Sequence, residues 1–168
     1  MRRMKTQRTG VYAGSFDPIT NGHLWMIEQG ARLFDQLVVT VGINPEKKYT
    51  FTLDERLAML RESIESIPNV SVTTFSNRYL IHYAQSINTS HILRGIRSVS
   101  DYEFERTMRH INDDLDPRVC TVFLMPPRDI AEISSSMVKG LIGPAGWKKV
   151  VRKYVPAPVY ARLGERHS

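Results

Sequence analysis

The residues best suited to chemistry lie in one ten-residue string near the N-terminus, Gly14-Ser15-Phe16-Asp17-Pro18-Ile19-Thr20-Asn21-Gly22-His23. His23 is expected in the first turn of a helix, because apolar residues follow at helical spacing at Leu24, Ile27, Ala31 and Phe34. Free backbone N–H groups and the positive end of the helix dipole favour a phosphate there. Glycines let the backbone approach a ligand closely, and Ser15 adds a hydroxyl donor. The string predicts a phosphate-binding loop.

Three further polar groups follow predicted strands. In Asn44-Pro45-Glu46-Lys47-Lys48 a flexible lysine can bridge two phosphates. In Leu93-Arg94-Gly95-Ile96-Arg97 two forked, permanently charged donors can project toward one anion. The run Ile133-Ser134-Ser135-Ser136 supplies a helix N-cap with hydroxyl and backbone donors. Each group alone has an ordinary reading, as a solvated lysine pair, a surface arginine pair or a helix cap. Together they indicate a site for polyanions.

The elements that must position these groups can be read from the apolar pattern. Segments 10–13, 37–43, 70–75, 91–93 and 120–124 are predicted strands, and the intervening stretches are predicted helices. One helix starts at the capping box Thr52-Leu53-Asp54-Glu55, and another is expected to open at Asp101 and to end before Pro117. Strands that alternate with helices imply right-handed parallel crossovers. The fold class is therefore α/β, a doubly wound, Rossmann-like sheet of five parallel strands with helices on both faces, whose ligands bind beyond the strands' carboxyl ends.

Bulk composition favours a single domain. The chain has 168 residues, of which 42% are apolar, and we expect one domain over 1–168, with 1–9 flexible and 144–168 as a helical extension. No apolar run approaches the roughly 18 residues of a membrane span, and the basic N-terminus lacks a signal core, so we expect no membrane contact and a cytoplasmic location. The net charge of +6 is scattered, which suits small polyanions and not nucleic acid. The single cysteine, Cys120, is expected to be buried.

The motif Thr20-Asn21-Gly22-His23 resembles the signature of the nucleotidyltransferase superfamily, which reads Thr or His, any residue, Gly, His. The wider string from Gly14 most resembles the bacterial phosphopantetheine adenylyltransferases, and the resemblance extends from Gly10 to about Lys139. It implies transfer of the adenylyl group of ATP to 4'-phosphopantetheine, which gives 3'-dephospho-coenzyme A and pyrophosphate in coenzyme A biosynthesis. It also implies Mg2+ bound mainly through the ATP phosphates without a dedicated protein site, a homohexamer, and feedback binding of coenzyme A.

The resemblance assigns roles residue by residue. Catalysis falls to His23, Ser15, Lys47 and Arg97. The acceptor is expected to contact Ser15, Lys47, Leu80 and Arg94. ATP is expected to contact Ser15, Phe16, His23, Gly95, Ile96, Arg97, Glu105, Ile130, Ala131, Glu132, Ile133, Ser134, Ser135 and Ser136. The chain departs from the family pattern at Ile130 and Glu132, and Asn77-Arg78 holds one extra residue ahead of Leu80.

Two other functions use the same residue types. The first is another enzyme of the superfamily, such as a nicotinate-mononucleotide adenylyltransferase or a cytidylyltransferase, against which the strings ending at His23 and Arg97 argue. The second is a non-catalytic nucleotide sensor or RNA-binding protein, whose signature would be an affinity for RNA that falls steeply with salt. Retention of His23, Lys47 and both arginines favours an enzyme.

Overall fold

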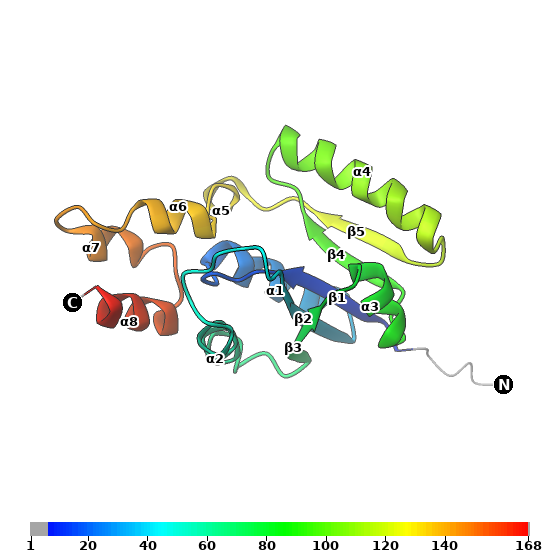
Figure 1. The fold of residues 1–168 in the computed structure, drawn as a ribbon, viewed down its shortest axis with the longest axis horizontal. Helices are drawn as coiled ribbons and strands as arrows, with labels where there is room; N and C mark the ends of the chain where they lie inside the picture. The colour runs from blue at the N-terminus through cyan, green and yellow to red at the C-terminus, as the bar shows by residue number, and fades with distance from the viewer. Residues whose placement is uncertain (1–6, 168) are drawn as a thin grey trace.

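A parallel sheet with helices on both faces forms the centre of the computed structural model, which describes residues 7–167 (Figure 1). The strands are β1 (Thr9–Gly14), β2 (Gln36–Ile43), β3 (Val70–Ser76), β4 (His91–Gly95) and β5 (Cys120–Leu124). Their order is β3-β2-β1-β4-β5, and every neighbouring pair is parallel. The doubly wound α/β class and the five predicted strands are confirmed.

The strand order reverses between β1 and β4, because the chain winds outward from β1 in two directions. Helices α1 (Asn21–Leu33) and α2 (Leu53–Ser63) connect β1, β2 and β3. Helices α3 (Leu80–Ser86) and α4 (Val99–Leu115) lead to β4 and β5 and cover the other side. Right-handed crossovers in opposite directions place their helices on opposite faces of the sheet. The carboxyl ends of β1 and β4 therefore lie side by side with no helix between them.

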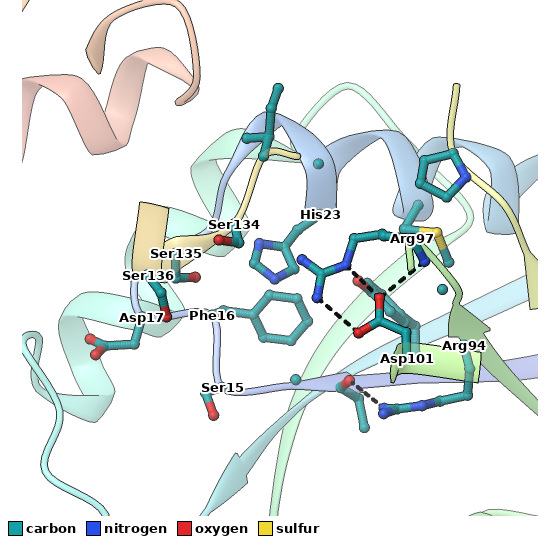
Figure 2. A pocket seen from close by; sticks show the side chains of 18 of the residues that line it. Ser15, Phe16, Asp17, His23, Arg94, Arg97, Asp101, Ser134, Ser135 and Ser136 are labelled. Atoms are coloured by element: carbon teal, nitrogen blue, oxygen red, sulfur yellow. Dashed lines mark hydrogen bonds and ion pairs between the residues drawn. The ribbon is translucent and has the colours of Figure 1, made fainter. Parts of the chain in front are cut away.

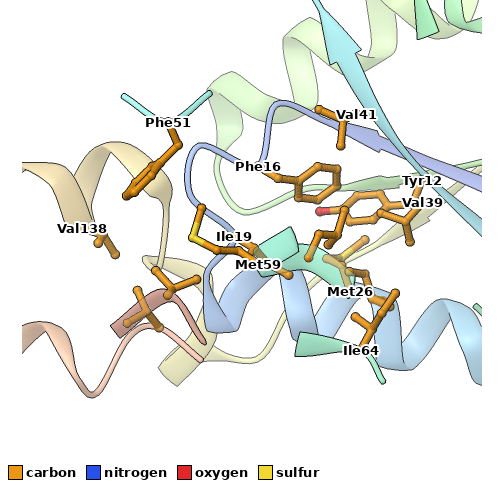
Figure 3. Close-up of a cluster of buried hydrophobic side chains, with 14 of the residues drawn as sticks. Tyr12, Phe16, Ile19, Met26, Val39, Val41, Phe51, Met59, Ile64 and Val138 are labelled. Atoms are coloured by element: carbon orange, nitrogen blue, oxygen red, sulfur yellow. The ribbon is translucent and has the colours of Figure 1, made fainter. Parts of the chain in front are cut away.

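The larger apolar cluster lies between the sheet and the helices α1 and α2 that cover one of its faces (Figure 3). There Tyr12, Val39 and Val41 of the strands pack with Met26 of α1 and Met59 of α2. After the short helices α5 (Arg128–Ala131) and α6 (Ser135–Gly140), the C-terminal segment folds back as α7 (Trp147–Val151) and α8 (Ala157–Arg166). It adds the fully buried side chains Val151, Val159 and Leu163 to the same cluster. Burial of each such side chain contributes about 1.5–3 kcal/mol.

Two expectations need correction. Cys120 is exposed, because β5 is an edge strand whose outer side has no neighbouring strand. Helix α4 begins at Val99 and not at Asp101, because the Ser98 hydroxyl accepts the Asp101 N–H at 3.1 Å and caps the helix earlier.

Two residues of the segment 1–9, Arg8 and Thr9, contact the folded domain. Thr9 pairs with Gln36 in the sheet, and the Arg8 N–H donates to Asp35 at 2.8 Å. Residues 1–6 lie outside the described part of the chain. Within residues 7–167, no helix combines the length and the apolar character that a membrane span requires.

Candidate active site

A cavity of about 550 Å³ opens at the carboxyl ends of β1 and β4, where the strand order reverses. It brings together residues from the loops after β1, β2, β4 and β5, as Figure 2 shows in part. Thirteen predicted residues line it: Ser15, Phe16, His23, Lys47, Arg94, Gly95, Arg97, Glu105, Ile130, Ile133, Ser134, Ser135 and Ser136. Three others, Ile96, Ala131 and Glu132, stand outside its lining, and Leu80 lines a neighbouring groove.

His23 is oriented by the cap of α1. Thr20 is the N-cap, its side chain accepts the His23 N–H, and its own backbone N–H donates to His23 Nδ1 at 3.1 Å. Because a backbone N–H can only donate, Nδ1 is the acceptor of the ring, and the proton of the neutral imidazole sits on Nε2. The motif Thr20-Asn21-Gly22-His23 is thus a capping box that fixes the tautomer of its own histidine.

The surroundings of His23 keep its ring neutral. Burial, together with the positive charge of Arg97, lowers the pKa of His23 from 6.5 to about 4. The ring packs edge-to-face on Phe16, with ring centroids 5.1 Å apart. A neutral imidazole at physiological pH can donate its Nε2 proton in a hydrogen bond to a phosphate oxygen, but it carries no extra proton to transfer.

Close approach between α1 and the loop before α6 explains the glycine of this motif. A Cβ atom on Gly22 would lie 2.6 Å from the backbone oxygen of Ile133, a contact that no side chain allows. The Ser135 hydroxyl donates to the Pro18 carbonyl at 2.8 Å, and Ser134 caps α6. Glycine at this position therefore allows the segment that carries the three serines to lie next to the phosphate-binding loop.

Lys47 and Ser15 meet across two loops. The Lys47 ammonium donates to Ser15 Oγ at 3.2 Å, which joins the loop after β2 to the loop after β1. Both residues line the cavity. The pair places the charge of a flexible lysine side chain next to a hydroxyl. This arrangement suits the binding of one phosphate close to a second phosphate.

Sequence reasoning did not assign Asp17, Lys139 or Asp101 to the site, although all three line the cavity. Asp17 is 3% exposed and accepts the N–H groups of Thr50 and Phe51 at 2.9 Å each. Lys139 donates to it at 3.1 Å, from 122 positions further along the chain. No local pattern could signal that pair, whereas the spacing of Arg97 and Asp101, four residues apart, could have indicated theirs.

Both predicted arginines are held by carboxylates of α4. Arg97 Nε donates to Asp101 at 3.0 Å, as the dashed lines of Figure 2 mark. Arg94 Nε donates to the buried Glu105 at 2.9 Å, and its Nη2 forms a second bond to the same carboxylate. Because Asp101 and Glu105 are one helical turn apart, α4 orients the two guanidinium groups together. Glu105, expected to contact the nucleotide, here holds Arg94 in place.

An apolar groove of about 300 Å³ adjoins the cavity and shares Ser15, Arg94 and Glu105 with it. Most of the rest of its wall is apolar or aromatic, including Phe75, Leu80 and Met108, and Arg109, Asn112 and Thr121 are its other polar residues. The polar cavity and the apolar groove therefore meet at a hydroxyl and a guanidinium. Such a pair of sites can hold a polyanion and a phosphate on a long uncharged chain at the same time.

Comparison with known sequences identifies relatives that cover nearly the whole chain. Residues 11–141 match the cytidylyltransferase-like family. The phosphopantetheine adenylyltransferase of Chromobacterium violaceum is 56% identical over 161 residues, which are 96% of this chain and 98% of that protein. The phosphopantetheine adenylyltransferase of Lacticaseibacillus paracasei is 39% identical over 166 residues, again 96% of this chain and 98% of that protein.

Solved structures show the same fold at much lower identity. The nicotinic acid mononucleotide adenylyltransferase of Plasmodium falciparum, complexed with NaAD, aligns with a TM-score of 0.67 and 14% identity, over 95% of this chain and 96% of that one. This likeness supports the Rossmann-like architecture alone. The sequence matches, which run through the phosphate-binding loop and the arginine motif, confirm the family predicted from those motifs, and the chain therefore belongs to the phosphopantetheine adenylyltransferases, within the cytidylyltransferase-like family.

Proposed function

We propose that this chain catalyses the reaction for which its relatives, the phosphopantetheine adenylyltransferases, are named. It transfers the adenylyl group of ATP to 4'-phosphopantetheine and releases pyrophosphate. The observation that carries this function is the junction of the polar cavity and the apolar groove at Ser15 and Arg94. ATP fills the cavity, the pantetheine arm lies along the groove beside Leu80, and the acceptor phosphate sits where the two sites meet.

The reaction forms one bond and breaks one. An oxygen of the acceptor phosphate attacks the α-phosphorus of ATP in line, and the bond from the α-phosphorus to the bridging oxygen breaks, so that pyrophosphate leaves with the electron pair. The nucleophile is already ionised, so no general base is required. Catalysis then depends on bringing two polyanions together and stabilising the charge on the α-phosphate and on the leaving group.

Each cavity residue has a role that its position supports. We assign His23 Nε2 as a neutral donor to the α-phosphate, and Ser15 with Lys47 as the bridge between the acceptor phosphate and ATP. Arg94 binds the acceptor phosphate and Arg97 the leaving phosphates, and Glu105 and Asp101 orient the two guanidinium groups. Within residues 7–167 the cavity is lined by four cationic side chains, Lys47, Arg94, Arg97 and Lys139, and three carboxylates, Asp17, Asp101 and Glu105.

Magnesium is proposed as the partner of the ATP phosphates. Residues 7–167 contain no group of three or more His, Cys, Asp or Glu side chains placed to hold a metal. We propose that the triphosphate and water hold most of the ion's coordination sites. When bound, the ion neutralises charge on the transferred and leaving phosphates. Lys47, Arg94, Arg97 and Lys139 supply the protein's own positive charge in this cavity.

Assembly, feedback and location are further parts of the proposal. Exposed apolar side chains gather on α4 and after β5, where Val99, Tyr102 and Met125 are 76%, 50% and 77% exposed. We assign this face to subunit contacts of a homohexamer, which light scattering of the full chain can test.

Coenzyme A, which combines a phosphopantetheine arm with a nucleotide, would compete for both sites, and displacement calorimetry can test that. The protein would act in the cytoplasm, which fractionation of the cells that make it can test.

Pyrophosphate release is expected only when ATP, magnesium and 4'-phosphopantetheine are all present. Dephosphorylated pantetheine should be inert, because it keeps every apolar contact of the groove but lacks the nucleophile and the anion for Lys47 and Arg94. The assay compares ATP and cytidine triphosphate with 4'-phosphopantetheine, pantetheine, nicotinate mononucleotide and glycerol 3-phosphate. Activity confined to another acceptor would assign the chain a different substrate. Tight ATP binding with no turnover in any pair would instead favour a nucleotide sensor.

The two arginines should separate by ligand. Arg94→Ala is expected to weaken phosphopantetheine binding more than ATP binding, by about 10-fold or more, because a charge-assisted bond to phosphate contributes about 1.5–3 kcal/mol. Arg97→Ala should show the opposite bias. Calorimetry of each ligand with each variant measures both effects, and Arg106→Ala, at an exposed position of α4, serves as the control. Equal losses for both ligands in both variants would contradict the assigned roles.

A further inference from the structure

Arg56 is a buried cation without a carboxylate partner. It is 2% exposed, and among the salt bridges of residues 7–167 none involves it. Its Nε is buried with no hydrogen-bond partner in the described residues. It also lies in the first turn of α2, where the helix dipole disfavours a positive charge. Both the burial of an unpaired charge and its position near the helix N-terminus lower the stability of the fold, so a structural role does not explain this arginine.

The guanidinium contacts the phosphate-binding loop. Arg56 Nη1 donates to the backbone carbonyl of Ser15 at 2.8 Å. The guanidinium carbon lies 3.9 Å from the ring centroid of Tyr49, so the ring faces the charge. Lys47, the residue bonded to Ser15 Oγ, is also near this ring, with its ammonium 5.7 Å from the centroid. Arg56 thus contacts the loop directly and Tyr49 contacts Arg56 and Lys47, while neither Tyr49 nor Arg56 lines the cavity.

The bond to the Ser15 carbonyl determines where the next amide points. In a trans peptide the C=O and N–H groups point in opposite directions. With the Ser15 carbonyl turned toward Arg56, the Phe16 N–H points away from Arg56, and Ser15, Phe16 and Lys47 all line the cavity. Phe16 adopts a φ of 47°, in the left-handed region that non-glycine residues seldom occupy, so this peptide needs an external contact to hold it. A cationic donor on the carbonyl also polarises the amide and strengthens its N–H as a donor.

We propose that Arg56 is a positioning residue for adenylyl transfer. It turns and polarises the Ser15–Phe16 peptide so that the Phe16 N–H donates to the phosphate held between Ser15 and Lys47. This inference rests on the proposed function, since that phosphate belongs to the reacting substrates. Arg56 itself touches no substrate, and its effect passes through the orientation of one peptide group.

Arg56→Met tests the proposal, because methionine keeps much of the apolar stem and removes every donor. The kcat for pyrophosphate release is expected to fall about 10- to 100-fold, since a misplaced donor at a reacting phosphate has effects of that order. The KM for phosphopantetheine and the calorimetric Kd for ATP should each stay within about 3-fold. The melting temperature should not fall, because the substitution removes a buried, unpaired charge. A residue with a merely structural role would lose stability along with turnover.

Two further variants complete the test. Arg166→Met is the matched control, because Arg166 also lies over an aromatic ring, that of Phe51, and is bonded to α2 but not to the loop. It should keep wild-type kcat. Arg56→Lys keeps the charge and one donor but lacks the planar group that stacks on Tyr49, so its kcat should fall between those of wild type and Arg56→Met.

The outcomes separate the two claims. An inactive wild-type chain would refute the proposed function and this inference with it. An active wild type beside an Arg56→Met variant of equal kcat would refute the inference alone, as would a loss of kcat accompanied by a lower melting temperature. Should Arg56→Met not fold, Arg56→Lys decides: reduced kcat at unchanged ATP affinity supports the positioning role, and wild-type kcat overturns it.

Discussion

His23→Ala is expected to lower kcat about 100- to 1,000-fold, equivalent to about 2.7–4 kcal/mol, the range for loss of one preorganised donor at a developing oxyanion. The structure gives His23 the required form, with Nδ1 occupied by the Thr20 N–H and the proton on Nε2. The melting temperature should shift by only a few degrees, because Thr20 still caps α1 and about one hydrogen bond is lost. Pyrophosphate release at saturating substrates measures the effect.

The exposed His110→Ala is the control for this experiment, since it removes a histidine of α4 that lines neither the cavity nor the groove. It should retain wild-type kcat. A His23→Ala variant with wild-type turnover would remove His23 from the mechanism. A variant with a large loss of both turnover and stability would show that His23 supports the fold instead.

The neutral state of His23 also has a consequence for stability. Its pKa is about 4 in the folded protein, against 6.5 as the unperturbed value, so between these pH values the unfolded chain binds a proton that the folded chain does not. The contribution of this site to the free energy of unfolding should therefore fall as the pH is lowered from 6.5 toward 4. His23→Ala should remove this pH dependence, which urea unfolding across the same range can measure.

Asp17→Ala is expected to produce the largest loss of stability among the cavity variants, on the order of 3 kcal/mol. The substitution removes a 3% exposed carboxylate that accepts two backbone N–H groups and the Lys139 ammonium. Those two N–H groups then lose their acceptor, and Lys139 loses its counter-ion. Turnover should fall as well, because Asp17 ties the loop after β1 to the residues that precede α2. Urea unfolding at neutral pH measures the stability.

Two variants and a pH series make this prediction specific. Asp17→Asn keeps an acceptor oxygen and should lose less, while the exposed Asp114→Ala should stay within about 0.5 kcal/mol of wild type. Burial raises the pKa of Asp17, but the bonds from Thr50, Phe51 and Lys139 outweigh burial and lower it below 3.8. Its contribution is therefore present above that pH and lost as the pH falls through the lower folded value. A difference between wild type and Asp17→Ala that persisted at lower pH would contradict this origin.

Much of the fold could be predicted from local patterns. All five strands began within about one residue of their predicted positions, because short apolar segments between polar turns carry a signal that needs no distant partner. The capping box at Thr52 was predicted in the same way, since a cap joins residues three positions apart, whereas the box at Thr20, which uses a histidine in place of Glu or Gln, was not predicted. The wrong start of α4 arose within that local range, where Ser98 and not a later residue supplied the cap.

The same distinction between local patterns and distant contacts applies to the candidate site. The sequence by itself indicated which residues are suited to phosphate chemistry, because His23, Lys47, Arg94 and Arg97 stand in recognisable strings after predicted strands, and all four line the cavity. Only the tertiary structure decided how they are held, since hydrogen bonds and ion pairs between distant segments depend on how strands and helices pack. The contact of Arg56 with Ser15 spans 41 positions and that of Lys139 with Asp17 spans 122. The solvent exposure of Cys120 was also decided by the tertiary structure. This residue lies in an apolar run of the sequence, but its strand, β5, is at the edge of the sheet and leaves it exposed.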